Sequence, residues 1–173
     1  CQLLDQKHLA PVVAQLDKTS GNTKAAFIDL IAAKSGKDYF EPIFALTNSG
    51  NADEKSAAFN ALKKVSTEKD LEQLIQLLLS VNNETEIAQV KMAVVAAAKG
   101  VEAERTESGK LLSALKKTDK KERIISILPE VGGNVALETV TGYFKNSTGT
   151  TKEAAFKALT NWKEYSVSNV LFE

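Results

Sequence analysis

The sequence predicts an all-α protein, an α-α superhelix (right-handed solenoid) of about five helix-pair repeats. Two observations predict this fold. The first is a segment, AAFNAL at 57–62, that recurs as AAFIDL at 25–30 and as AAFKAL at 154–159. The second is a series of anchor residues spaced 32, 33, 33 and 31 residues apart: Phe27, Phe59, Met92, Ile125 and Phe156. A fixed period of this length is typical of stacked repeats, so we expect the anchors to occupy equivalent buried positions.

The best-marked repeat, 52–83, predicts two helices joined by a short turn. Apolar residues fall at three- and four-residue steps in its first half and again in its second half. Asp53 is a suitable N-cap for the first helix, and the pair Ser66-Thr67 interrupts the pattern between the helices. The apolar residues are Ala57, Ala58, Ala61, Leu62 and Val65, followed by Leu71, Leu74, Ile75 and Leu78.

The same template divides the chain into a single array that is incomplete at both ends. Because 11–14 (PVVA) parallels 42–45 (PIFA), we expect the chain to begin with the second helix of a partial repeat. The last apolar stripe, 167–172, is cut off at Glu173, which predicts a longer protein or a last helix that docks on another domain or subunit. The predicted repeats are 1–21 (partial), 22–51, 52–83, 84–118, 119–149 and 150–173 (partial).

Particular residues are expected to begin and end the remaining helices. Thr23 and Thr151 are suitable N-caps for the first helices of their repeats. Gly36 is expected to end a helix in the left-handed conformation. Pro129 and the pair Gly132-Gly133 are expected to end the first helix of repeat 119–149.

The composition argues against two classes of protein. Of the 173 residues, 43% are apolar, which is enough to bury a sizeable core. The 22 basic residues equal the 22 acidic ones, whereas nucleic-acid binders usually carry a strong basic excess. No apolar run approaches the roughly 20 residues that a membrane-spanning helix needs. We therefore expect neither a nucleic-acid partner nor a transmembrane segment.

The one cysteine, Cys1, excludes a disulfide framework and a cysteine-rich zinc site. It is either the start of a processed or cloned chain with an incidental thiol, or the acylated first residue of a bacterial lipoprotein. Lipoprotein cysteines are commonly followed by a polar tether, but here an apolar helical pattern begins almost at once. We therefore favour the first interpretation and keep a lipid anchor at Cys1 as the alternative.

The two-helix period, the prolines that open some second helices and the AAxxAL first helices resemble HEAT-type repeats of the short bacterial variety. The resemblance covers essentially the whole chain and implies an armadillo-like α-solenoid. Tetratricopeptide and ankyrin signatures are absent. The polar loops and the segment NWKEY at 161–165 also resemble the helical-repeat portion of secreted Bacteroidetes proteins, where such arrays accompany sugar-hydrolase-like β-domains. That likeness implies the bacterial periplasm or cell surface.

The sequence provides no candidate catalytic, metal-binding or cofactor-binding residues. His8 is the only histidine, which excludes a cage of several imidazoles, and we interpret it as a solvent-facing helix residue. Phosphate-binding and dinucleotide-binding glycine motifs are absent, as is a nucleophile elbow. Carboxylate pairs such as Glu102 with Glu104 lie in loops and first turns, where they complement the helix dipole. We expect a protein that is not an enzyme and needs no cofactor.

A partner-binding surface is predicted on the second helices, which line the concave face of such arrays. Its residues lie off the apolar stripes and mix acidic, amide, basic and aromatic groups, a mixture that suits a protein or peptide ligand. Exposed aromatics are the usual anchors of such surfaces. The residues are Phe40, Glu41, Phe44, Glu72, Gln73, Gln76, Ser113, Lys116, Glu138, Thr139 and Tyr143.

Three functions are compatible with these features. The first is a non-catalytic scaffold for protein–protein interaction. The second is an accessory repeat domain of a larger enzyme, of which a carbohydrate-active one is an example, whose catalytic domain lies outside this chain. The third is a nucleic-acid enzyme resembling HEAT-like alkylpurine DNA glycosylases, which the zero net charge argues against. We favour the scaffold.

Overall fold

A computed structural model describes residues 9–34, 36–99 and 107–162. Within these ranges every regular element is an α-helix or a 3-10 helix, and no strand occurs, which confirms the all-α prediction. The chain divides into two compact units, unit 1 (1–97) and unit 2 (98–173). The division falls inside a helix of the predicted repeat 84–118.

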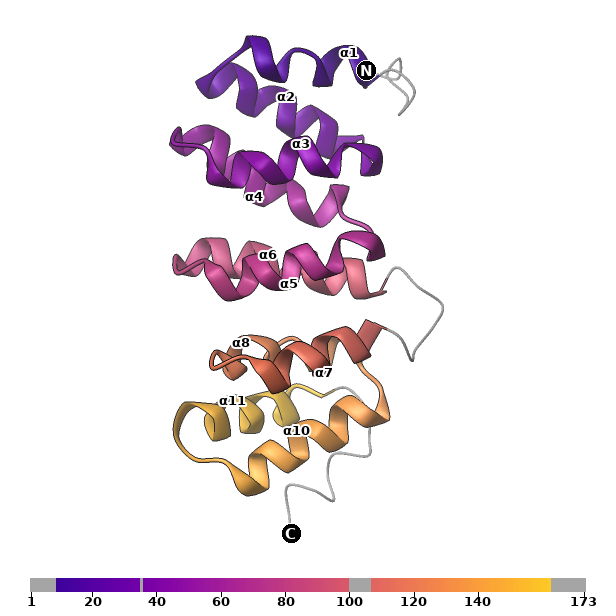
Figure 1. The fold of residues 1–173 in the computed structure, drawn as a ribbon, viewed down its shortest axis with the longest axis vertical. Coiled ribbons are helices and arrows are strands. Elements are labelled where there is room, and N and C mark those ends of the chain that lie inside the picture. Colours follow the sequence, from indigo (N-terminus) through magenta and orange to yellow (C-terminus); the bar gives the residue numbers. More distant parts are fainter. Residues whose placement is uncertain (1–8, 35, 100–106, 163–173) are drawn as a thin grey trace. The chain divides into compact units, whose positions relative to one another are not determined.

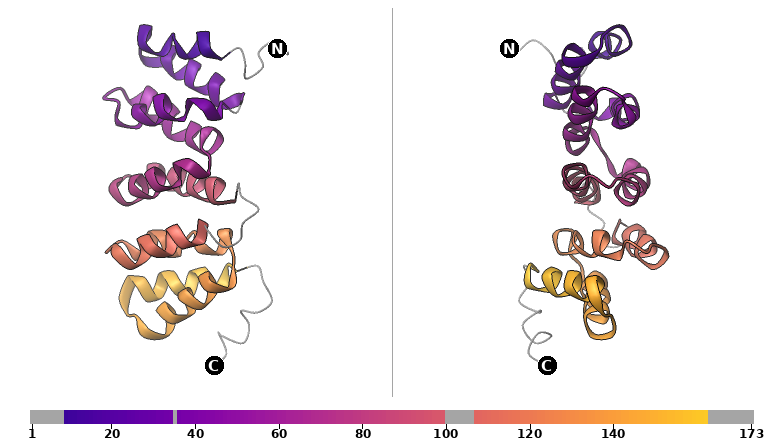
Figure 2. Two further views of the ribbon diagram at one scale, coloured as in Figure 1. Left: turned by 45° about the vertical axis from the view of Figure 1, so that its right-hand side comes forward. Right: turned by 90° about the vertical axis from the view of Figure 1, so that its left-hand side faces the viewer.

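Unit 1 contains pairs of helices whose members lie on two sides. Figure 2 shows α2, α4 and α6 on one side of unit 1 and α3 and α5 on the other, as the repeat template predicts for first and second helices. Short 3-10 turns, including η3 (Lys37–Tyr39) and η5 (Glu68–Asp70), lead into the second helices. The helices in Figure 1 are α1 (Ala10–Val13), α2 (Gly21–Ala33), α3 (Phe40–Ala45), α4 (Ala52–Val65), α5 (Leu71–Ser80) and α6 (Glu84–Lys99).

Unit 2 contains the helices α7 (Glu107–Lys117), α8 (Lys121–Ile125), α9 (Leu128–Val131), α10 (Asn134–Asn146) and α11 (Gly149–Thr160). Helix α11 packs against both α8 and α10. The predicted first helix of repeat 119–149 is divided into α8 and α9, because Pro129 has no amide for an intrahelical bond and its ring would meet the preceding turn. Proline therefore opens α9 rather than ending a longer helix.

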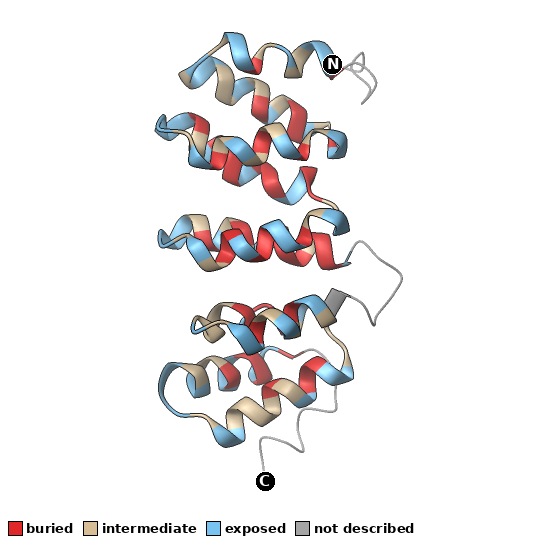
Figure 3. Cartoon of the chain, viewed as in Figure 1, coloured by how far each residue is buried: buried red, intermediate tan, exposed pale blue. Residues whose placement is uncertain are grey.

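Burial defines a register of the first helices that differs from the predicted one. In each first helix, buried residues recur at steps of three and four. Figure 3 shows buried stretches in red alternating with exposed stretches in pale blue along the helices. Repeats aligned on these residues are 30, 32, 34 and 31 residues apart. The sets are Ile28, Ile31 and Ala32; Ala58, Ala61 and Leu62; Val90, Ala93 and Val94; Ile124, Ile127 and Leu128; and Ala155, Ala158 and Leu159.

The predicted equivalence of the five anchors is therefore wrong. Phe59 and Ile125 are buried, but Met92 is 40% exposed and Phe156 is 48% exposed. Phe27 precedes Ile28, the first residue of its buried set, by one position, whereas Phe59 follows Ala58, the first residue of its set, by one. One residue turns a helix by about 100°, so Phe27 and Met92 lie on other helix faces than Phe59 and Ile125. Phe156 keeps the register of Phe59 but is exposed.

The N-caps also differ from the predicted ones. Asn51, not Asp53, caps α4, because its Oδ1 accepts hydrogen bonds from the amides of Asp53 and Glu54 at 3.0 and 3.2 Å. Helices α2 and α11 begin earlier than expected, and Thr23 and Thr151 lie inside their first turns. The N-cap residues there are Ser20 and Thr148, and neither side chain makes a capping hydrogen bond.

Gly36 follows α2 but does not adopt the expected left-handed conformation, since its φ is −72°. The residue is buried because other side chains approach its Cα closely. The positive φ angles of 82° and 93° instead belong to Gly132 and Gly133, between α9 and α10. Several other predictions, among them the stripe at 167–172, the roles of Cys1 and His8 and the pairing of Glu102 with Glu104, lie outside the described residues.

Candidate interaction surface

In unit 1 a hydrogen bond joins two second helices at positions one repeat apart. Gln73 Nε2 on α5 donates to Glu41 Oε1 on α3 at 3.2 Å, across 32 residues of sequence. Phe44 and Gln76 are also 32 residues apart, so they occupy equivalent positions on α3 and α5. The structure thus brings the predicted residues of α3 and α5 together on one face, which we call the α3–α5 face: Glu41, Phe44, Glu72, Gln73 and Gln76.

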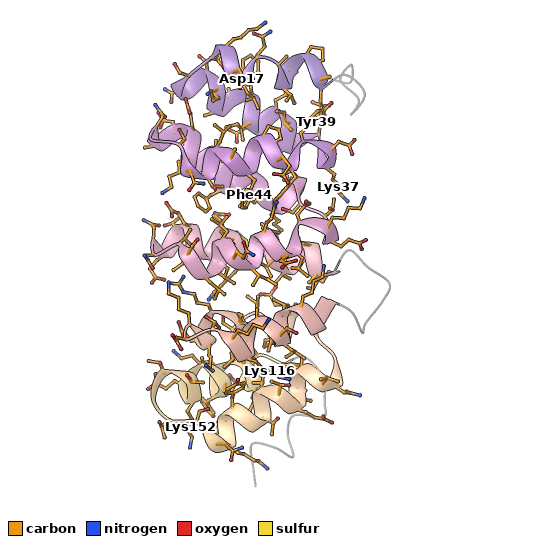
Figure 4. All side chains as sticks on the ribbon, viewed as in Figure 1. Asp17, Lys37, Tyr39, Phe44, Lys116 and Lys152 are labelled. Atoms are coloured by element: carbon orange, nitrogen blue, oxygen red, sulfur yellow. The ribbon has the colours of Figure 1, made fainter. Side chains whose placement is uncertain are left out.

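The two phenylalanines of α3 have different roles. Phe40 was predicted on the surface, but it is only 3% exposed and belongs to the core. Phe44 is half-buried, and its ring packs against that of Phe40 with 5.1 Å between centroids. Figure 4 shows Phe44 between the ribbons of α3 and α5. Phe40 therefore packs against Phe44 from the core, and Phe44 is the aromatic residue that a partner could contact on this face.

The charged residues of the second helices in unit 1 are all acidic. Glu41 and Glu72 are the only charged residues in α1, α3 and α5, and both are exposed. Gln73 and Gln76 are exposed as well and add neutral amides. The α3–α5 face therefore combines two carboxylates, two amides and part of one aromatic ring.

Unit 2 contains the remaining predicted residues, on α7 and α10. Ser113, Lys116 and Glu138 are exposed, whereas Thr139 and Tyr143 are half-buried. The Thr139 hydroxyl donates to the carbonyl of Val135 at 2.7 Å, so it already has an acceptor within its own helix. Each group of predicted residues is thus placed within its own unit.

A groove of about 250 Å³ that was not predicted lies between the first helices α4 and α6. At its wall Lys55 Nζ pairs with Glu86 Oε1 at 2.6 Å and lies 5.7 Å from the centroid of the Phe59 ring. A second groove, of about 260 Å³, lies between α8 and α11. None of the eleven predicted residues lines either groove. Two positions beyond the first residue of each buried set, three of the five first helices carry a polar residue, Asn60, Ser126 or Lys157, and each of these lines a groove.

A buried carboxylate joins the first helices α2 and α4. Glu54 accepts hydrogen bonds from the Gly21 amide at 2.7 Å and from the Ser49 hydroxyl at 2.8 Å, and Lys24 Nζ lies 3.8 Å away. The Ser49 hydrogen bond, followed by the Gly21 amide and the Lys24 charge, lowers the pKa of Glu54 from its ordinary value although burial opposes the shift. Glu54 thus supplies the cap that Ser20 does not provide for α2.

The described residues include neither a candidate metal site nor a candidate membrane-spanning helix. No cluster of three or more His, Cys, Asp or Glu side chains in the described ranges is arranged to hold a metal ion. Among the helices of 9–34, 36–99 and 107–162, none is both long enough and apolar enough to cross a bilayer.

In comparisons with known proteins, no protein-family model matches the chain and no curated protein is detectably similar.

Proposed function

We propose that the protein is a non-catalytic interaction scaffold of the HEAT-like kind. In this proposal its helix pairs stack as a solenoid and a polypeptide partner binds to the second helices. The recurrence of buried residues at steps of three and four in five first helices supports the repeat assignment.

The observation that carries the proposal is the α3–α5 face. Phe44 is held at a defined position by Phe40 and is partly accessible, as a binding anchor must be. The hydrogen bond from Gln73 to Glu41 fixes the two helices side by side, so that their exposed groups form one surface. Tyr143 on α10 provides a second half-buried aromatic ring, in unit 2.

Selection from a random peptide display library against the full chain tests the proposal. We expect the selected peptides to lose about tenfold or more in affinity when Phe44→Ala or Tyr143→Ala is introduced, because aromatic anchors dominate such contacts. Phe156→Ala is the matched control, since Phe156 is a 48% exposed aromatic on the first helix α11. Peptides indifferent to both Phe44→Ala and Tyr143→Ala would contradict the proposal.

A further inference from the structure

The α3–α5 face carries uncompensated negative charge. Neither Glu41 nor Glu72 forms an ion pair within the described residues, and Glu41 accepts only the neutral amide of Gln73. The 3-10 turns that precede these helices do not supply a positive excess: η3 carries Lys37 and Asp38, and η5 carries Glu68, Lys69 and Asp70.

The aromatic group on the same face suits a cation or an apolar side chain. Phe40 covers one side of the Phe44 ring, and part of Phe44 remains accessible. A guanidinium or ammonium group over an accessible aromatic ring is attracted by the ring's electrons. Arginine adds a planar fork that matches a carboxylate with two hydrogen bonds.

The spacing favours an extended chain over a small cation. Packed helices lie about 8–10 Å apart, a distance that about three residues of extended polypeptide span. One cationic residue can therefore reach Glu41 on α3 while another reaches Glu72 on α5. The Gln76 amide, one repeat after Phe44, has both donor and acceptor atoms for a peptide backbone between them.

Building on the function proposed above, we propose that the α3–α5 face binds a cationic polypeptide segment in which Arg or Lys residues alternate with large apolar residues. The cations pair with Glu41 and Glu72, and an apolar side chain or a guanidinium plane covers the accessible part of Phe44. Phe40 acts only by positioning Phe44.

Fluorescence anisotropy with labelled synthetic peptides of alternating Arg and Leu, or of Glu and Leu in the same pattern, tests this inference on the full chain. We expect the Arg peptide to bind at least tenfold more tightly at low salt, and its affinity to fall when ionic strength rises from about 0.05 M to about 0.5 M. An Arg peptide that binds no better than the Glu peptide overturns the inference.

The double variant Glu41→Gln/Glu72→Gln removes both charges while keeping shape and hydrogen-bonding capacity. It is expected to weaken Arg-peptide binding about fivefold, since exposed ion pairs are individually modest. The matched control is Asp29→Asn/Glu84→Gln, which removes two exposed carboxylates from α2 and α6, and it should change affinity less than about twofold. Equal losses in the two double variants indicate non-specific attraction and also overturn the inference.

The two proposals fail in different ways. Display-selected peptides that depend on Phe44 but carry no cationic excess would retain the scaffold and remove the cationic partner. Selected peptides that ignore Phe44 and Tyr143 would remove the scaffold itself.

Discussion

Gly36 lies where a side chain does not fit. A Cβ atom there would lie 2.8 Å from Ile31 Cγ2 and 3.1 Å from Leu9 Cδ1, and both of those side chains are 0% exposed. The φ of −72° is open to any residue, so glycine is required for space and not for backbone conformation.

We expect Gly36→Ala to destabilise the protein by about 1–3 kcal/mol, the usual effect of overpacking, measured as the urea midpoint by circular dichroism. Gly142→Ala is the control. Gly142 lies inside α10 with open space around its Cα, so alanine should stabilise that helix by about 0.5–1 kcal/mol. Equal effects of the two substitutions would show that the contacts of Gly36 are unimportant.

Glu54 makes the free energy of unfolding depend on pH, and its hydrogen bonds determine the direction of that dependence. The pKa of Glu54 is lowered in the folded protein from an ordinary value near 4.5. The ionised carboxylate therefore stabilises the fold above that value, and this stabilisation is lost as pH falls through the lowered folded pKa. Glu54→Gln removes the carboxylate. We expect the variant to unfold at lower urea than the wild type at pH 7, and the difference to shrink in acid.

Urea titrations at several pH values between neutrality and acid would measure this effect. Ser49→Ala removes the largest cause of the shift and should reduce the pH dependence without abolishing it. Unfolding curves of wild type and Glu54→Gln that differ by a constant amount at every pH would exclude Glu54 as the source.

At the scale of the helix, α4 and α6 are capped by a side chain just before their first residue, whereas the N-cap residues of α2 and α11 make no such hydrogen bond. Asn51 caps α4, and Asn83 Oδ1 accepts from the Thr85 and Glu86 amides at the start of α6, at 2.9 and 3.2 Å. We expect Asn51→Ala and Asn83→Ala each to cost about 1 kcal/mol in urea unfolding. Ser20→Ala and Thr148→Ala remove no capping hydrogen bond and should cost less; a larger loss from either would contradict the assignment of the caps.

Most of the helices could be predicted because their signals are local. Apolar steps of three and four residues, and polar breaks between them, determine α4 and α5 from within each segment. The register of the first helices could not be read from large residues, because side-chain volume does not reveal direction: Met92 is 40% exposed while the small Ala93 beside it is 0% exposed.

The candidate face was predicted only in part, for a related reason. Glu41, Glu72, Gln73 and Gln76 are exposed as their positions off the apolar stripe predict. Phe40 is the first residue of α3, and its ring lies in the core although its position falls off the predicted apolar stripe. Contacts between repeats, such as that of Glu54 with Gly21, join residues far apart in sequence and leave no local pattern.

At the scale of the whole molecule, each unit has a core of its own. Leu74 in unit 1 and Leu115 in unit 2 are both 0% exposed, so Leu74→Ala and Leu115→Ala should each cost about 2–5 kcal/mol. Amide hydrogen exchange of the full chain should rise mainly in the unit that carries the substitution. Equal acceleration throughout both units would show that they unfold as one.

Trp162 allows the same question to be followed optically. It is the single tryptophan of the sequence, lies in unit 2 and is 7% exposed. Its fluorescence therefore reports unit 2, whereas circular dichroism reports the helices of both units. Under Leu74→Ala the dichroism midpoint should fall more than the fluorescence midpoint.

The carboxylate that completes the start of α2 has a consequence for biosynthesis. The Gly21 amide donates its hydrogen bond to a residue 33 positions later in the chain. On the ribosome, α2 leaves the exit tunnel before Glu54 does, and the Gly21 amide stays hydrated until Glu54 has emerged and α4 has formed. The start of α2 is therefore completed only when α4 has folded beside it.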